Sequence, residues 1–114
     1  MQNFIQKGDT LTVTAPTGGV VSGQGLLVGA VFGVATDTAG AGASVGLLTE
    51  GVVELPKASA AVFAVGAKVS WDNNNARSDV PASGRYPIGA ASEGAANGDA
   101  TVRVRLDGVS TAAA

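Results

Sequence analysis

Two residue types that carry much of protein chemistry are missing from this chain of 114 residues, which has no cysteine and no histidine. The lack of cysteine excludes disulfide bonds, zinc fingers, iron–sulfur ligation and thiol nucleophiles, and it fits synthesis in a reducing cytosol. The lack of histidine removes the commonest general base, the Ser–His pair and the commonest transition-metal ligand. We therefore expect no enzyme activity, no metal site and no cofactor.

Charged side chains are also scarce. Only 14% of the residues are charged, against about 25% in a typical soluble domain. The formal net charge is −2, so the chain lacks the basic patch that binders of nucleic acid or of anionic membrane surfaces need. Because 46% of the residues are hydrophobic, little charge keeps copies of the chain apart. The composition therefore predicts a protein partner and association into a homo-oligomer.

Long hydrophobic runs are absent as well. The longest, residues 26–35, has ten residues and includes two glycines, whereas a helix that crosses a bilayer needs about 20 apolar residues. Residues 1–7 lack the basic start and the apolar stretch of a secretory signal. We expect a soluble protein that is made inside the cell, and a chain of this length predicts one domain.

Alternation of apolar and polar residues with a period of two recurs along the chain and predicts β-strands. Residues 10–15 alternate with threonines on one face before Pro16 ends the strand. Residues 101–106 repeat the pattern, and residues 68–72 do so before an asparagine turn, which predicts a hairpin into residues 76–78. Further short strands are expected at residues 20–22, 26–35, 44–48, 51–55 and 86–91.

Short strands at close spacing predict an all-β fold, a small single-domain β-barrel or sandwich. At most one short helix is expected, within the alanine-rich residues 58–64. The β domain is expected to cover residues 10–109. Residues 1–9 are expected to form an extended N-terminal arm, and residues 110–114 a flexible C-terminal tail without an anchor.

Four motifs suggest chemistry, and in each case a structural role is favoured. Residues 40–46 have glycines spaced as in a dinucleotide-binding loop, but no helix is expected after them, so a hairpin connection is favoured. Residues 72–75 are rich in side-chain oxygen, but the twelfth position from Asp72 is serine where a calcium loop needs glutamate, so a turn is favoured. Arg103 and Arg105 lie on the same strand face and could bind phosphate, but a face exposed to solvent or in contact with another subunit is favoured. Lys57 and Ser59 are two residues apart, which does not establish a Ser–Lys pair.

Several segments, taken in their order along the chain, resemble those of a known family. They are a short arm at residues 3–9 and the segments Leu-Leu-Val-Gly (26–29), Phe-Gly-Val-Ala (32–35), Thr-Glu-Gly-Val (49–52), Glu-Leu-Pro-Lys (54–57), Val-Gly-Ala-Lys-Val (65–69), Trp-Asp (71–72), Ile-Gly (88–89), Gly-Asp (98–99) and Val-Arg-Val-Arg-Leu (102–106). This order resembles the small head proteins of tailed phages, long catalogued as a domain of unknown function and now regarded as capsid decoration, or cement, proteins. The resemblance covers nearly the whole chain.

The resemblance implies an all-β subunit without catalytic residues that docks on the outside of a shell of major capsid protein, across subunit seams. It implies a place on the outer surface of the virion, after synthesis in the bacterial host cytoplasm. The expected partners are the major capsid protein and further copies of the chain, as a trimer in preference to a dimer, with no nucleic acid and no membrane. The residues expected at capsid or oligomer contacts are Phe4, Ile5, Gln6, Trp71, Arg77 and Tyr86.

A second class of function remains as an alternative, a small β-barrel module that binds carbohydrate or another small ligand. Such sites concentrate aromatic side chains beside polar groups. The chain has only one Trp, one Tyr and three Phe, so its composition favours the structural role.

Overall fold

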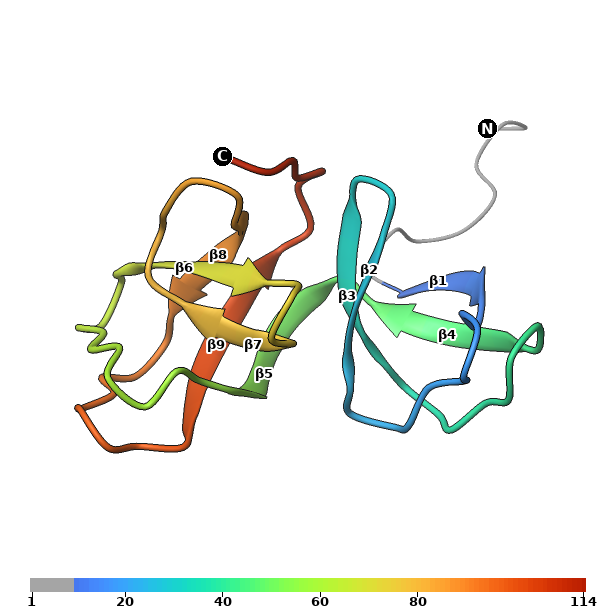
Figure 1. Cartoon of the computed structure of the whole chain (residues 1–114), viewed down its shortest axis with the longest axis horizontal. Coiled ribbons are helices and arrows are strands. Elements are labelled where there is room, and N and C mark those ends of the chain that lie inside the picture. Colours follow the sequence, from blue (N-terminus) through green and yellow to red (C-terminus); the bar gives the residue numbers. More distant parts are fainter. Residues whose placement is uncertain (1–9) are drawn as a thin grey trace, which may run out of the picture.

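A computed structural model describes residues 10–114, and these form nine β-strands and no helix (Figure 1). The strands are β1 (Thr10–Thr14), β2 (Gly25–Val28), β3 (Val31–Ala35), β4 (Ser44–Leu48), β5 (Glu50–Pro56), β6 (Lys68–Asp72), β7 (Arg77–Asp79), β8 (Tyr86–Ala91) and β9 (Thr101–Asp107). A four-stranded sheet has the order β1-β4-β3-β2, and a five-stranded sheet has the order β5-β9-β8-β6-β7. The predicted all-β fold is confirmed.

Most predicted strands are present, with two differences. Residues 26–35 form two strands, because Gly29 adopts a positive φ of 58° and makes with Ala30 a two-residue turn that pairs Val28 with Val31. Residues 20–22 form no strand, and Val20 makes only an isolated bridge with Ala39. Both differences arise because a run of apolar residues does not show where the chain reverses.

The five-stranded sheet curls until its two edge strands meet. β5 pairs with β9 along its whole length, and at the far edge β7 pairs with β6. Lys57, directly after β5, forms a parallel bridge with Ser78 of β7, and the Ala58 N–H donates to the Ser78 carbonyl at 2.9 Å. The sheet therefore forms a partly closed barrel whose edges protect each other.

One core fills the barrel and extends into the smaller sheet. On β9 the apolar side chains are buried while Thr101, Arg103 and Arg105 are exposed, as the alternation predicts. Trp71 of β6 is only 2% exposed, and its ring contacts that of Phe32 on β3 with centroids 4.9 Å apart. The sheets are thus joined by side-chain packing. They are also joined by the chain itself, because only residue 49 separates β4 from β5.

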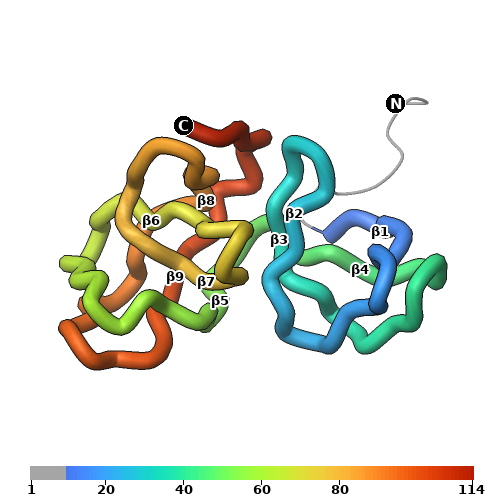
Figure 2. Tube along the Cα trace, in the orientation of Figure 1, coloured from blue at the N-terminus to red at the C-terminus, as the bar shows by residue number. Residues whose placement is uncertain are grey.

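The C-terminal residues are held by backbone hydrogen bonds. The Thr111 N–H donates to the Ala30 carbonyl at 2.7 Å, the Ala114 N–H to the Arg85 carbonyl at 2.9 Å, and the Gly84 N–H to the Ala114 carbonyl at 2.8 Å. Figure 2 shows this segment between the barrel and the β2–β3 hairpin. The expectation that residues 110–114 lack an anchor is therefore corrected. Their sequence held no sign of it, because the bonds use only main-chain groups.

Gly25 provides a test of the packing between the sheets. A Cβ atom at this position would lie 2.7 Å from Trp71 Cη2 and 3.1 Å from Phe32 Cζ. We expect Gly25→Ala to lower the free energy of unfolding by about 1–3 kcal/mol, because the aromatic pair must shift. In the control Gly40→Ala the new methyl group meets nothing within 4 Å, so stability should stay within about 1 kcal/mol of the wild type. If urea unfolding shows the same loss of unfolding free energy for both variants, the close packing of residue 25 against the aromatic pair is refuted.

Candidate interaction surfaces

Within residues 10–114, no cluster of acidic side chains could hold a metal ion. The same residues include no helix long and apolar enough to span a membrane. The buried hydroxyl groups of Ser78 and Thr111 find no hydrogen-bond partner among the described residues, and Ser78 is fully buried. Ser59 presents only its carbonyl oxygen to the Lys57 ammonium group, at 3.2 Å, so these two residues form no nucleophile–base pair.

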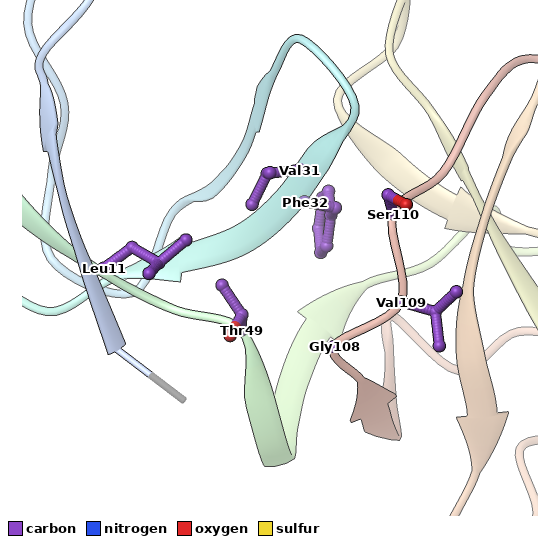
Figure 3. A pocket seen from close by; sticks show the side chains of 7 residues that line it. All are labelled: Leu11, Val31, Phe32, Thr49, Gly108, Val109 and Ser110. Atoms are coloured by element: carbon purple, nitrogen blue, oxygen red, sulfur yellow. The ribbon is translucent and has the colours of Figure 1, made fainter. Parts of the chain in front are cut away.

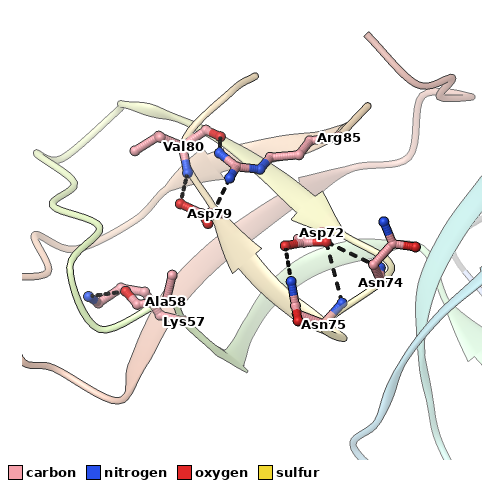
Figure 4. Close-up of polar contacts among 8 residues, drawn as sticks. All are labelled: Lys57, Ala58, Asp72, Asn74, Asn75, Asp79, Val80 and Arg85. Carbon is pink, nitrogen blue, oxygen red and sulfur yellow. Dashed lines mark hydrogen bonds and ion pairs between the residues drawn. The ribbon is translucent and has the colours of Figure 1, made fainter. Parts of the chain in front are cut away.

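Lys57 is a buried cation that organises a loop. Lys57 is only 5% exposed, and its Nζ donates to the Ala58 carbonyl oxygen at 2.9 Å (Figure 4). The same Nζ donates to the carbonyl oxygens of Ser59 at 3.2 Å and Ala61 at 2.6 Å. An ammonium group has three N–H donors, so all are used. These carbonyls converge on one point, whereas in a helix they would run parallel to the axis. Lys57 thereby explains why the alanine-rich residues 58–64 form a loop.

We expect Lys57→Met to lower the free energy of unfolding by about 2–4 kcal/mol, because it leaves buried carbonyl groups without donors. The matched control is Lys68→Met, since Lys68 begins β6 with an exposed side chain. That substitution should change stability by less than about 0.5 kcal/mol. Urea unfolding of both variants measures the difference, and similar values would show that the Lys57 hydrogen bonds contribute little.

The structure locates three of the six predicted contact residues, and Phe4, Ile5 and Gln6 lie outside the described residues. Arg77 is exposed on β7, and Tyr86 is half-buried at the start of β8. Trp71 requires a correction, because a side chain that is 2% exposed has no surface to offer a partner. Its indole instead packs between the two sheets, where a large apolar ring contributes most.

Polar side chains stabilise the connections around β7. Asp72 accepts hydrogen bonds from the side chain of Asn75 at 2.7 Å and from the N–H groups of Asn74 and Asn75 (Figure 4). These bonds lower the pKa of the Asp72 carboxyl, and the bond from the Asn75 side chain has the largest effect. The Arg85 guanidinium lies 3.2 Å from the Asp79 carboxylate and donates to the Val80 carbonyl at 2.8 Å. The oxygen atoms of residues 72–75 thus stabilise the turn that the sequence predicted.

Two further motifs also have structural roles. Residues 36–43 connect the antiparallel strands β3 and β4, so Gly40 and Gly42 lie in the connection and Gly46 lies within β4, as expected for a hairpin connection. Arg103 lies on an exposed strand face, 3.1 Å from Glu93 and 3.7 Å from Glu54. Such exposed ion pairs contribute little to stability. The sequence did not reveal them, because the three residues are brought together only by strand pairing and by the loop after β8.

A small cavity of about 210 Å³ lies where the two sheets meet (Figure 3). The described residues that line it are uncharged. They come from β1, β3, the link between the sheets and the segment after β9: Leu11, Val31, Phe32, Thr49, Gly108, Val109 and Ser110. Pockets for drug-sized ligands usually have about 300–1,000 Å³. This cavity is smaller than that range.

The smaller sheet leaves two edges open. In the described part of the chain no further strand pairs with the outer side of β1 or of β2. Neither strand contains a charged residue or a proline, the usual protections against strand addition. The barrel edges differ, since they meet at the bridge between Lys57 and Ser78. Open backbone groups for an added strand therefore lie on the smaller sheet, and residues 1–9 directly precede β1.

Comparison with known proteins shows the family to which the chain belongs. The model of a family described as phage cement protein matches residues 5–106. Searches of curated proteins and of solved structures give no match.

Proposed function

Because the chain belongs to the phage cement protein family, we propose that it binds the outer surface of the major capsid protein shell across subunit seams and stabilises the head. Membership gives the chain a structural, capsid-associated role in the virion and points to a protein that is not an enzyme. The match over residues 5–106 is the observation that carries this proposal, and we propose synthesis in the host cytoplasm before attachment.

The open edges of the smaller sheet support a binding mode by strand addition. An extended segment that pairs with an exposed edge gains main-chain hydrogen bonds along its length, and alternate side chains fill pockets. We propose that residues 1–9 form an arm that adds as a strand to an exposed sheet edge, either on a neighbouring capsid subunit or on a second copy of this chain. Phe4 and Ile5 are the apolar side chains that would be buried, and Gln6 would border the contact.

Association of several copies would strengthen attachment to a shell. A shell repeats each binding site many times, so an oligomer with modest affinity per contact gains avidity. We propose a homo-oligomer, a trimer in preference to a dimer, and no contact with nucleic acid or membrane. The scarcity of charge supports this proposal, because few charged groups would lose water when copies pack together. Arg77 and Tyr86 remain proposed contacts, since each keeps some exposed surface.

The purified chain mixed with phage heads that lack it should sediment with the heads. Binding should saturate at a ratio set by the lattice, because the shell offers a fixed number of equivalent sites. Quantifying the chain in the pellet against added protein checks this. A small-ligand module would stay in the supernatant, and that result would refute the proposed function.

Deletion of residues 1–6 tests the role of the arm. Burying two apolar side chains contributes about 3–5 kcal/mol per arm, less the cost of ordering the segment. We expect the bound fraction to fall while the melting temperature stays within a few degrees of the wild type, because β1 keeps its pairing with β4. If binding survives and the melting temperature collapses, residues 1–6 belong to the fold and the proposed arm is wrong.

A further inference from the structure

The barrel ends, on the side away from the smaller sheet, in an apolar surface that is bordered by two exposed carboxylates, those of Glu93 and Asp99. The Asp99 carboxylate accepts a hydrogen bond from the Ala96 N–H at 2.8 Å. Two loops form this surface, one between β5 and β6 and one between β8 and β9 (Figure 1). We call residues 59–66 and 94–98 the tip, and neither segment contains a charged residue. Val62 is 59% exposed and Val65 is 72% exposed, although both side chains are apolar. Ala60, Ala64 and Ala96 are exposed beside them in the same loops.

The two loops are held in place before any partner binds. Phe63 and Ala95 exchange backbone hydrogen bonds of 2.9 and 2.8 Å, and their buried side chains belong to the barrel core. The Gly98 N–H donates to the Ser59 carbonyl at 2.7 Å, and Lys57 fixes the start of the first loop from within. Since Phe63 points inward, its neighbour Val62 points outward. The exposure of Val62 is therefore a consequence of the local fold.

Burying a surface of this kind costs little free energy. Alanine has no side-chain rotamers to lose, and valine has few, whereas lysine or glutamate would each lose up to about 2 kcal/mol of rotamer entropy. The nearest charged groups, Glu93 and Asp99, lie at the border of the tip, so contact through Val62 and Val65 does not require either carboxylate to lose its water. Preformed loops also avoid the cost of ordering a flexible segment on binding. The tip is thus suited to close contact with another uncharged protein surface.

We propose that the tip is a docking surface for the major capsid protein shell, an inference that rests on the proposed function. A second copy of the chain is the less suitable occupant, because five small side chains provide far less area than the roughly 800 Å² per partner of a stable dimer. A shell needs less area per contact, since the contacts of many attached copies add up. The capsid surface that receives the tip is expected to be apolar and uncharged.

The position of the tip adds a second point of attachment far from the first. The molecule measures 45 Å along its longest axis, and the tip and β1 lie at opposite ends of that axis (Figure 1). The proposed arm directly precedes β1. Contacts at both ends would let one subunit reach two positions on the shell, which is the geometry that binding across a seam requires.

Charge substitutions in the tip test this inference. Val62→Asp and Val65→Asp should each raise the apparent Kd for phage heads lacking the chain by roughly tenfold or more, because a carboxylate would be buried without a partner. Val21→Asp is the matched control, since Val21 is 61% exposed but lies before β2 in the smaller sheet. Its Kd should stay within about twofold of the wild type. All three variants should keep the wild-type melting temperature, because each altered side chain is exposed.

Co-sedimentation with the heads and sedimentation velocity of the free proteins separate the outcomes. If the wild type does not bind heads, the proposed function fails and the inference fails with it. If the wild type binds and both tip variants bind as tightly as the Val21→Asp protein, only the inference is refuted. If the tip variants break up an oligomer that the Val21→Asp protein retains, the tip is an interface between copies, and this too refutes it. Selective loss of head binding, with an unchanged oligomeric state, supports the inference.

Discussion

The contact of Trp71 with Phe32 is the interaction on which the arrangement of the two sheets depends. Only one residue links β4 to β5, so the covalent chain alone does not set how the sheets face each other. The tilted ring pair, with Gly25 lying against it, brings β3 into the barrel core. The hydrogen bond from Thr111 to Ala30 adds a second link near the same place. Apolar burial at this junction therefore orders two sheets whose described strands do not pair with each other.

The distribution of sheet edges divides the molecule into a closed part and an open part. The barrel brings its own edges together through Lys57 and Ser78, and so leaves few backbone groups free for pairing with another chain. Among the strands of residues 10–114, none pairs with the outer side of β1 or of β2, and neither of these strands carries a charge. The proposed function needs a stable body and surfaces that accept a neighbour, and we propose that the barrel supplies the body and the tip while the smaller sheet supplies the open edges.

A single buried cation connects fold and proposed docking. The ammonium group of Lys57 gathers carbonyls that follow it in the sequence, and this turns an alanine-rich segment away from helix. The loop that results presents small apolar side chains outward and Phe63 inward. Small side chains also make up much of the chain as a whole, which lets neighbouring surfaces approach closely. The scarcity of charge in the composition thus extends to residues 59–66 and 94–98, which form the tip.

The sequence by itself determined the all-β class, the alternation on β1 and β9, the turn after Asp72 and the family, because each depends on residues close together in the chain or on their order. It could not place Trp71 in the core, since burial depends on Phe32, which lies on the other sheet. It could not show the anchored C-terminus or the closure of the barrel, which use backbone groups that every residue carries. Nor could it tell that Lys57 is buried. Only the tertiary structure decided these points, because side-chain exposure and main-chain pairing are set by segments that meet after folding.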